Sequence, residues 1–134
     1  MQVLVTGASC MLGRKLAQRF AGTGSIGSRA ITRLRLHDIV EPTIPTTAAF
    51  SVETAVSDLS VAGEAEKLVA DQPEVIFHLA AMPGLAKSWT DFDLYSTCNI
   101  QATQRLLEAV RRGSGKLKRF VYISTSSVYG RYAS

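Results

Sequence analysis

Short apolar segments alternate with amphipathic segments along the chain, and this alternation is the feature that most restricts how the chain can fold. Five segments are rich in β-branched and other apolar residues, and three of the intervening segments carry apolar side chains at helical spacing. Neighbouring parallel strands require a crossover connection, which is usually a helix. The alternation therefore predicts right-handed βαβ units in an α/β domain, with a parallel sheet covered by helices on both faces.

The five predicted strands differ in length but share an apolar character. They lie at Val3–Val5, Leu34–Asp38, Phe50–Val56, Val75–Phe77 and Phe120–Ile123. In a parallel sheet, ligands bind outside the carboxyl ends of the strands. The residues that directly follow each strand are therefore the first candidates for a functional site.

The three predicted helices each carry an apolar stripe. The first buries Leu12, Leu16 and Phe20 and ends in a flexible loop over Gly22–Ser28. The second takes Ser60 as its N-cap, with an apolar side made of Val61, Ala65, Leu68 and Val69. The third runs from about Asp91 to Arg112, with a stripe of Leu94, Cys98, Ala102, Leu106 and Val110. No internal boundary interrupts this order, so we expect one domain over residues 1–134.

Composition and charge exclude several classes of protein. A chain of 134 residues with 46% hydrophobic and 19% charged residues is typical of a globular domain rather than a disordered one. No apolar run approaches the roughly 18 residues of a membrane span, and no secretion signal is visible, so we expect a cytoplasmic protein with no membrane partner. Cys10 and Cys98 have no CxxC partner, which predicts no metal site. The net charge of +4 comes without an aromatic or groove-reading motif, so we expect no nucleic-acid binding.

The turn after the first strand has the residues of a phosphate-binding loop. It reads Thr6-Gly7-Ala8-Ser9-Cys10-Met11-Leu12-Gly13 and leads into the N-terminus of the first helix. Backbone N–H groups and the positive end of the helix dipole attract a pyrophosphate at such a position. Asp38 ends the second strand, where a carboxylate accepts the ribose hydroxyls of NAD and repels the 2′-phosphate of NADP. The alternative is an ordinary strand–helix turn with a surface aspartate.

Motifs at four strand ends together resemble those of a known family. The glycine turn is followed by His78-Leu79-Ala80-Ala81, then by Asn99 with Thr103, then by a Ser/Thr-rich run over 124–130. In this order they resemble the extended short-chain dehydrogenase/reductases, the NAD-dependent epimerase/dehydratase group, over all 134 residues. The early part is also similar to erythronate dehydrogenases, and the part from His78 onward to nucleotide-sugar epimerases. The resemblance implies a Rossmann-type sheet that stops after its fifth strand.

The resemblance also implies roles for individual residues. Thr125 matches the active-site Ser/Thr of the family, which hydrogen-bonds the substrate while hydride moves to or from the nicotinamide. The pyrophosphate, adenosine and remaining parts of NAD would be held by Gly7, Cys10, Met11, Leu12, Gly13, Asp38, Asp58, Leu59, Ala80, Ala81 and Asn99.

Cys10 departs from the family pattern Gly-x-x-Gly-x-x-Gly, because it stands at the middle glycine. That glycine lets the backbone approach the pyrophosphate without an intervening Cβ. Two interpretations follow. Cys10 is a tolerated substitution that weakens NAD binding, which we favour, or it is a reactive thiol activated by the helix N-terminus and open to oxidation.

The proton donor of the family is a second departure. It is a Tyr-x-x-x-Lys pair, and none of the tyrosines that can be tested here has that partner: Tyr95 leads to Asn99 and Tyr122 to Ser126. We therefore expect the front part of a longer enzyme, without the substrate-binding portion and inactive alone. Ser126 and Ser127 stand where dehydratases of the family carry acidic residues, which argues against dehydration and leaves epimerisation or alcohol oxidation.

These observations predict the NAD-binding part of an oxidoreductase or epimerase that acts on a nucleotide sugar or sugar acid. The alternative is a non-catalytic dinucleotide-binding or interaction module, which Cys10 and the missing Tyr/Lys pair favour. A sheet that ends after the fifth strand leaves apolar surface uncovered, and the stripe of the long helix faces a dimer partner in the family. We therefore expect a homodimer or a self-associating chain.

Overall fold

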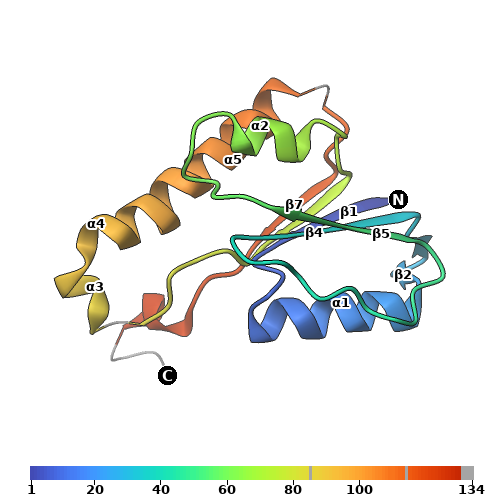
Figure 1. Ribbon diagram of the computed structural model, residues 1–134, viewed down its shortest axis with the longest axis horizontal. Coiled ribbons are helices and arrows are strands. Elements are labelled where there is room, and N and C mark those ends of the chain that lie inside the picture. The colour runs from blue at the N-terminus through green and yellow to red at the C-terminus, as the bar shows by residue number, and fades with distance from the viewer. Residues whose placement is uncertain (85, 114, 131–134) are drawn as a thin grey trace.

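A five-stranded parallel sheet forms the centre of the molecule (Figure 1). The computed structural model describes residues 1–84, 86–113 and 115–130. The strand order is β5 (Ser51–Val56), β4 (Arg33–Asp38), β1 (Gln2–Thr6), β6 (Val75–His78) and β7 (Arg119–Tyr122). The chain thus starts in the middle strand, winds outward to one edge and then returns to build the other side. This is the order of a Rossmann-type sheet, and it confirms the predicted α/β fold.

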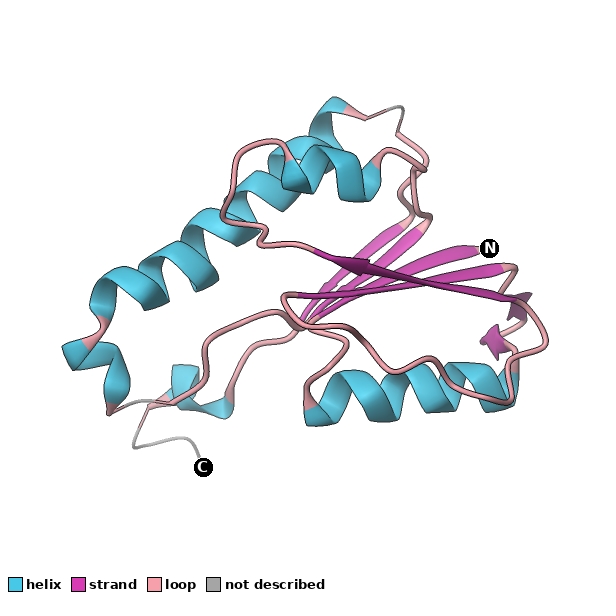
Figure 2. Cartoon of the chain, in the orientation of Figure 1, coloured by secondary structure: helices cyan, strands magenta, loops and turns pink. Residues whose placement is uncertain are grey.

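Helices cover both faces of this sheet (Figure 2). Helix α1 (Met11–Thr23) lies on one face. The other face carries α2 (Glu64–Val69) and a long helical segment made of α4 (Phe92–Tyr95), the π-helix η1 (Ser96–Gln101) and α5 (Ala102–Arg112). Two short elements complete the described chain, α3 (Lys87–Thr90) and the 3₁₀ helix η2 (Ser126–Tyr129).

Each face of the sheet has its own hydrophobic core. On the α1 face, Val3, Val5, Leu34 and Leu36 pack with Phe20. On the opposite face, Leu4 and Ile76 pack against residues of α2 and α5, among them Leu68, Ala102 and Leu106. Alternate residues of β1 therefore point into opposite cores, which is why the three consecutive residues Val3, Leu4 and Val5 are all apolar.

Several predicted details of the helices and loops are wrong. The segment over Gly22–Ser28 is not only a loop, because it leads into a hairpin of β2 (Ser25–Ile26) and β3 (Arg29–Ala30). Helix α2 begins after Gly63 rather than at Ser60, whose amide instead donates a hydrogen bond to the Asp58 carboxylate in a turn before the helix. Leu12, Val61 and Leu94 are about half exposed, although the helical stripes placed them inside. Helical periodicity shows which side chains share a face of a helix, but not how far along the helix that face is packed.

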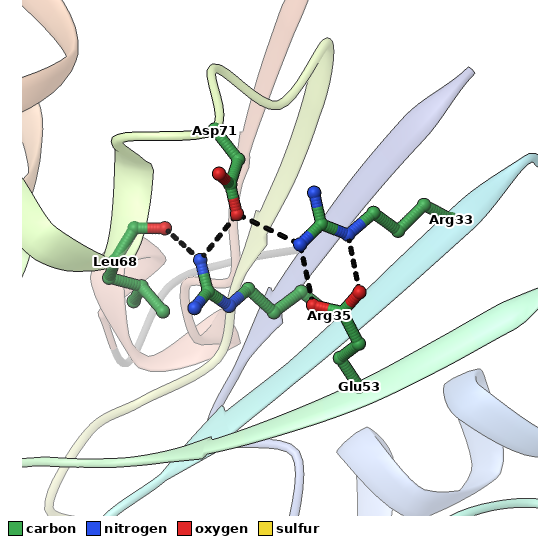
Figure 3. A network of polar contacts seen from close by, with 5 residues as sticks. All are labelled: Arg33, Arg35, Glu53, Leu68 and Asp71. Carbon is green, nitrogen blue, oxygen red and sulfur yellow. Dashed lines mark hydrogen bonds and ion pairs between the residues drawn. The ribbon is translucent and has the colours of Figure 1, made fainter.

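An ion-pair network ties the neighbouring strands β4 and β5 to the segment after α2 (Figure 3). Arg33 donates two hydrogen bonds to the Glu53 carboxylate, at 2.8 and 2.6 Å. Asp71 contacts the guanidinium groups of both Arg33 and Arg35, each at 3.0 Å. Arg35 also donates to the carbonyl of Leu68. The network begins at the first residue of β4, so it lies toward the end of that strand opposite to Asp38.

Among the described residues, no helix has both the length and the apolar character that a membrane span needs.

Candidate functional site

A cleft of about 330 Å³ lies at the carboxyl ends of the strands. It is formed where the chain leaves β1 for β4 on one side and β6 lies on the other, the reversal of strand order at which open α/β sheets bind ligands. The loops that build it are drawn in pink at this end of the sheet in Figure 2. Its lining is Gly7, Ser9, Cys10, His37, Asp38, Ile39, Val40, Asp58, Leu59, Leu79, Ala80, Ala81, Met82, Cys98 and Ala102.

Seven of the site residues predicted from the sequence line this cleft together. They come from the ends of four strands, β1, β4, β5 and β6: Gly7, Cys10, Asp38, Asp58, Leu59, Ala80 and Ala81. The parallel sheet explains why they meet, because the strand ends that carry them all lie at one edge. Their roles toward a cofactor stay predictions.

Two glycines allow the turn after β1 to pack closely. Gly7 has φ +72°, and a Cβ on it would lie 2.6 Å from the backbone N of Ala80. A Cβ on Gly13 would lie 2.3 Å from the carbonyl oxygen of Gly7. Both positions therefore require glycine. At Gly7 the chain that leaves β1 touches the chain that leaves β6, and at Gly13 the first turn of α1 touches the loop that precedes it. This close packing leaves the N-terminus of α1 directed at the cleft.

Cys10 is the N-cap of α1. Its backbone is extended, with φ −70° and ψ 165°, so a side chain there meets no backbone strain. Its sulfur accepts a hydrogen bond from the amide of Gly13 at 3.2 Å. The thiol thereby occupies one of the amides at the helix N-terminus that have no partner within the helix. A phosphate bound at this terminus would have to compete with the thiol for the same donor.

Asp38 fixes the geometry of the turn as well as lining the cleft. One carboxylate oxygen accepts from the amide of Ser9 at 2.8 Å, and the other accepts from the amide of Ile39 at 2.7 Å. The Ser9 hydroxyl adds a bond to the carbonyl of Val40. Each carboxylate oxygen keeps a further lone pair for a ligand hydroxyl. Asp38 therefore connects β4 to the phosphate turn and still offers acceptor capacity to the cleft.

Asn99 acts on the cleft through a neighbouring loop. It lies in the π-helical segment, and its side chain forms two hydrogen bonds to the backbone of Met82. Its Oδ1 accepts from the Met82 amide at 2.7 Å, and its Nδ2 donates to the Met82 carbonyl at 3.1 Å. Met82 lines the cleft whereas Asn99 does not. The predicted direct contact with a cofactor remains untested, and the observed contacts make Asn99 a support for the cleft wall.

Two buried histidines stand beside the cleft. Burial lowers the pKa of His78 to about 4, with a smaller contribution from repulsion by His37 when that ring is protonated, so the His78 imidazole is neutral near pH 7. Burial also lowers the pKa of His37, although the neighbouring Asp38 opposes this. The Nε2 of His37 lies 3.0 Å from the hydroxyl oxygen of Ser57. Both rings are thus uncharged hydrogen-bonding groups at neutral pH.

Five predicted site residues lie outside the cleft lining: Met11, Leu12, Gly13, Asn99 and Thr125. The side chains of Met11 and Leu12 are exposed at the first turn of α1. Thr125 follows β7 and is exposed, and its carbonyl accepts from the amide of Val128. Its catalytic role stays a prediction.

Sequence reasoning missed several residues of the cleft wall, among them two with titratable side chains. His37 and Cys98 were assigned to a strand interior and to an apolar helical stripe, but both line the cleft. A signal for His37 was available, because a polar residue beside Asp38 at a strand end is unusual in a buried strand. Burial raises the pKa of the Cys98 thiol, with a smaller contribution from Asp58. Among the described residues, no group of three or more His, Cys, Asp or Glu side chains is arranged to hold a metal ion.

The chain is similar to known proteins in both sequence and structure. A family model described as "NAD dependent epimerase/dehydratase family" matches residues 3–134. The chain is 34% identical to an uncharacterized UDP-glucose epimerase, YtcB, of Bacillus subtilis, over 97% of this chain and 42% of that protein.

Two solved structures of similar proteins superimpose on the chain. The nucleoside-diphosphate-sugar epimerase from Agrobacterium tumefaciens has a TM-score of 0.89 and 36% identity, over 100% of this chain and 40% of that one. MoeE5, in complex with UDP-glucuronic acid and NAD, has a TM-score of 0.77 and 35% identity, over 97% and 38%. The chain therefore spans about two fifths of the length of the proteins that it matches.

Proposed function

The chain belongs to the NAD-dependent epimerase/dehydratase family, and from that premise we propose that it is the NAD-binding part of an enzyme that acts on nucleotide sugars or sugar acids. The whole protein would transfer hydride between NAD and a hydroxyl carbon of such a substrate. The observation that carries this proposal is the cleft itself, in which the glycine turn, Asp38 and the residues after β6 share one wall.

The residues of the cleft fit the parts of a dinucleotide. Gly7 and Gly13 let the turn pack closely against β6 and against the start of α1, whose free amides would bind a pyrophosphate. Asp38 would accept the adenosine ribose hydroxyls through its remaining lone pairs. Leu59 is buried and, with Ala80 and Ala81, gives the apolar surface that a flat adenine ring requires.

The chemistry divides between the cofactor and the protein. NAD supplies the site that accepts or returns a hydride. The chain would hold that cofactor in the cleft, and Thr125 would hydrogen-bond a substrate hydroxyl or carbonyl. No tyrosine that can be tested in the sequence is followed by the lysine of a Tyr-x-x-x-Lys pair, so we expect no turnover by these residues alone.

Calorimetric titration with NAD and with NADP tests the proposal. We expect NAD to bind and NADP to bind more weakly, because the Asp38 carboxylate repels a 2′-phosphate. The Asp38→Asn variant keeps an acceptor oxygen but removes the charge. The ratio of the affinities for NAD and NADP should therefore decrease. Glu41→Gln is the matched control, since it makes the same charge change at an exposed residue outside the cleft lining. Absence of NAD binding by the wild-type chain would contradict the proposal.

A non-catalytic dinucleotide-binding module is the second candidate function, and the thiol of Cys10 at the phosphate turn favours it. Absorbance of NADH, followed with UDP-sugars and with aldonic acids, separates the candidates. Net NADH release indicates a dehydrogenase, and interconversion of sugars without it indicates an epimerase. Turnover by the chain as given would exclude the non-catalytic module.

We also propose self-association through the long helical segment. Phe92, Leu94, Ile100 and Leu107 are exposed along it, with Phe92 at 64% and Ile100 at 65% exposure. Exposed apolar area of this kind favours contact with a second copy. Sedimentation equilibrium should give a mass above 14.5 kDa that falls toward this value in Leu107→Glu. A monomer at all concentrations would contradict this proposal.

A further inference from the structure

His78 lies at the centre of a chain of hydrogen bonds that joins three elements around the cleft. Its Nδ1 is 2.6 Å from the Thr6 hydroxyl oxygen at the end of β1. Its Nε2 is 2.9 Å from the Thr103 hydroxyl oxygen on α5. The Thr103 hydroxyl in turn donates to the carbonyl of Asn99 at 2.9 Å. The chain thus runs from the strand before the phosphate turn, through β6, to the π-helical segment.

One arrangement of protons satisfies all three contacts. A hydroxyl carries one proton, and Thr103 gives its proton to the Asn99 carbonyl, so it accepts from Nε2–H of His78. The Nδ1 of the ring is then an acceptor, and the Thr6 hydroxyl donates to it. His78 and Thr6 are at most 1% exposed, so water does not replace these partners. A neutral imidazole in a single tautomer is required for the chain to be complete.

The same residues enclose the loop that forms one wall of the cleft. Residues 79–82 all line the cleft, and the loop starts directly after His78. Its far end is held by the two bonds between the Asn99 side chain and Met82. Because Thr103 connects His78 to the carbonyl of Asn99, the loop and the helix form a closed hydrogen-bonded ring. The π-helical turn, in which the Ala102 amide reaches back to the Thr97 carbonyl, places Asn99 within that ring.

We propose that His78 is a positioning residue of the dinucleotide site, which orients the wall 79–82 against the phosphate turn by joining Thr6 to Thr103. This inference rests on the proposed function for its ligand but not for its geometry. A buried polar ring among apolar neighbours specifies one orientation of the groups that it joins, which an apolar residue of the same size would not do. The groups in contact with His78 are Thr6 from β1, Thr103 from α5, and the rings of Phe120 and Tyr122 from β7. His37, on β4 beyond β1, acts on it electrostatically.

Breaking the ring at Thr103 tests the proposal. Thr103→Val keeps the shape of the side chain but removes the hydroxyl, whereas Thr103→Ser keeps the hydroxyl and is the matched control. We expect hydrogen exchange of the Met82 amide to be about tenfold faster in the valine variant, and its dissociation constant for NAD about tenfold higher. The serine variant should stay within about twofold of wild type in both measurements.

Asp71→Asn is the control for general destabilisation, because it weakens the ion-pair network away from the cleft. In this variant we expect no change in the affinity for NAD. The rate of hydrogen exchange at the Met82 amide, relative to the rates at neighbouring amides, should also stay the same. If Thr103→Val does not fold, Thr6→Val removes the hydroxyl on the other side of the ring and is measured in the same way. Unchanged exchange at Met82 in the folded variant would overturn the proposal. A wild-type chain that does not bind NAD would overturn the proposed function alone, since the exchange measurement still decides the role of His78.

Discussion

Replacing Cys10 by glycine should tighten the binding of NAD. The Cys10 sulfur accepts the Gly13 amide at 3.2 Å, so the substitution frees that donor and removes the side chain from the turn. A hydrogen bond from a backbone amide to a charged phosphate contributes about 1.5–3 kcal/mol. Since about 1.4 kcal/mol corresponds to a factor of ten, we expect the dissociation constant to fall by about tenfold or more.

Loss of the cap has a smaller opposing effect. Glycine is itself an acceptable N-cap, so the free energy of unfolding should fall by only a few tenths of a kcal/mol. Calorimetric titration with NAD, alongside urea unfolding, measures both quantities. Cys10→Ser is the matched control. Its hydroxyl still accepts the Gly13 amide, so its affinity for NAD should rise little above that of wild type. An affinity in Cys10→Gly within about twofold of wild type would refute the reasoning that the thiol competes with a phosphate.

Three further predictions concern stability. Gly7→Ala should lower the free energy of unfolding by about 3 kcal/mol or more, because φ is +72° and the new Cβ meets the Ala80 backbone. Gly22→Ala, in α1 with open space around it, should instead raise the free energy of unfolding slightly. Equal effects of the two substitutions in urea unfolding would contradict this prediction. Because the pKa of His78 is lowered, the unfolded chain binds more protons than the folded chain between pH 6.5 and about 4. The free energy of unfolding should therefore fall by up to about 3 kcal/mol as the pH drops through that range. A free energy of unfolding that does not change over it would contradict the burial of a neutral ring. Glu53→Gln should cost less than about 1 kcal/mol in the same assay, because its ion pair with Arg33 is partly exposed; a loss of several kcal/mol would show that the network is a main source of stability.

The strand pattern of the sequence was sufficient to predict the sheet and the place of the cleft. Apolar runs such as Val75–Phe77 reveal buried parallel strands, and in such a sheet the residues after each strand must meet at one edge. This is why Gly7, Asp38 and Ala80, far apart in sequence, were expected together and line one cleft. The resemblance to a family added roles that spacing alone does not give.

Side-chain partners across the sheet could not be predicted in the same way. The bond between Thr6 and His78 joins residues 72 positions apart, and its existence depends on the register of β1 with β6. Likewise, Cys10 caps α1 only because its sulfur faces the amide of Gly13. From the sequence alone, Cys10 is recognised only as a departure from the glycine expected at that position. Ser60 failed as an N-cap because the Asp58 carboxylate takes its amide in a turn before the helix starts. Such local competition between polar groups is decided by geometry rather than by residue type.

The most direct test of this account is a crystal structure of the chain grown with NAD. The account predicts the pyrophosphate at the N-terminus of α1 beside Gly7, with the adenosine ribose on the Asp38 carboxylate. A turn whose Cys10 thiol still caps Gly13, with NAD absent or bound elsewhere, would contradict it.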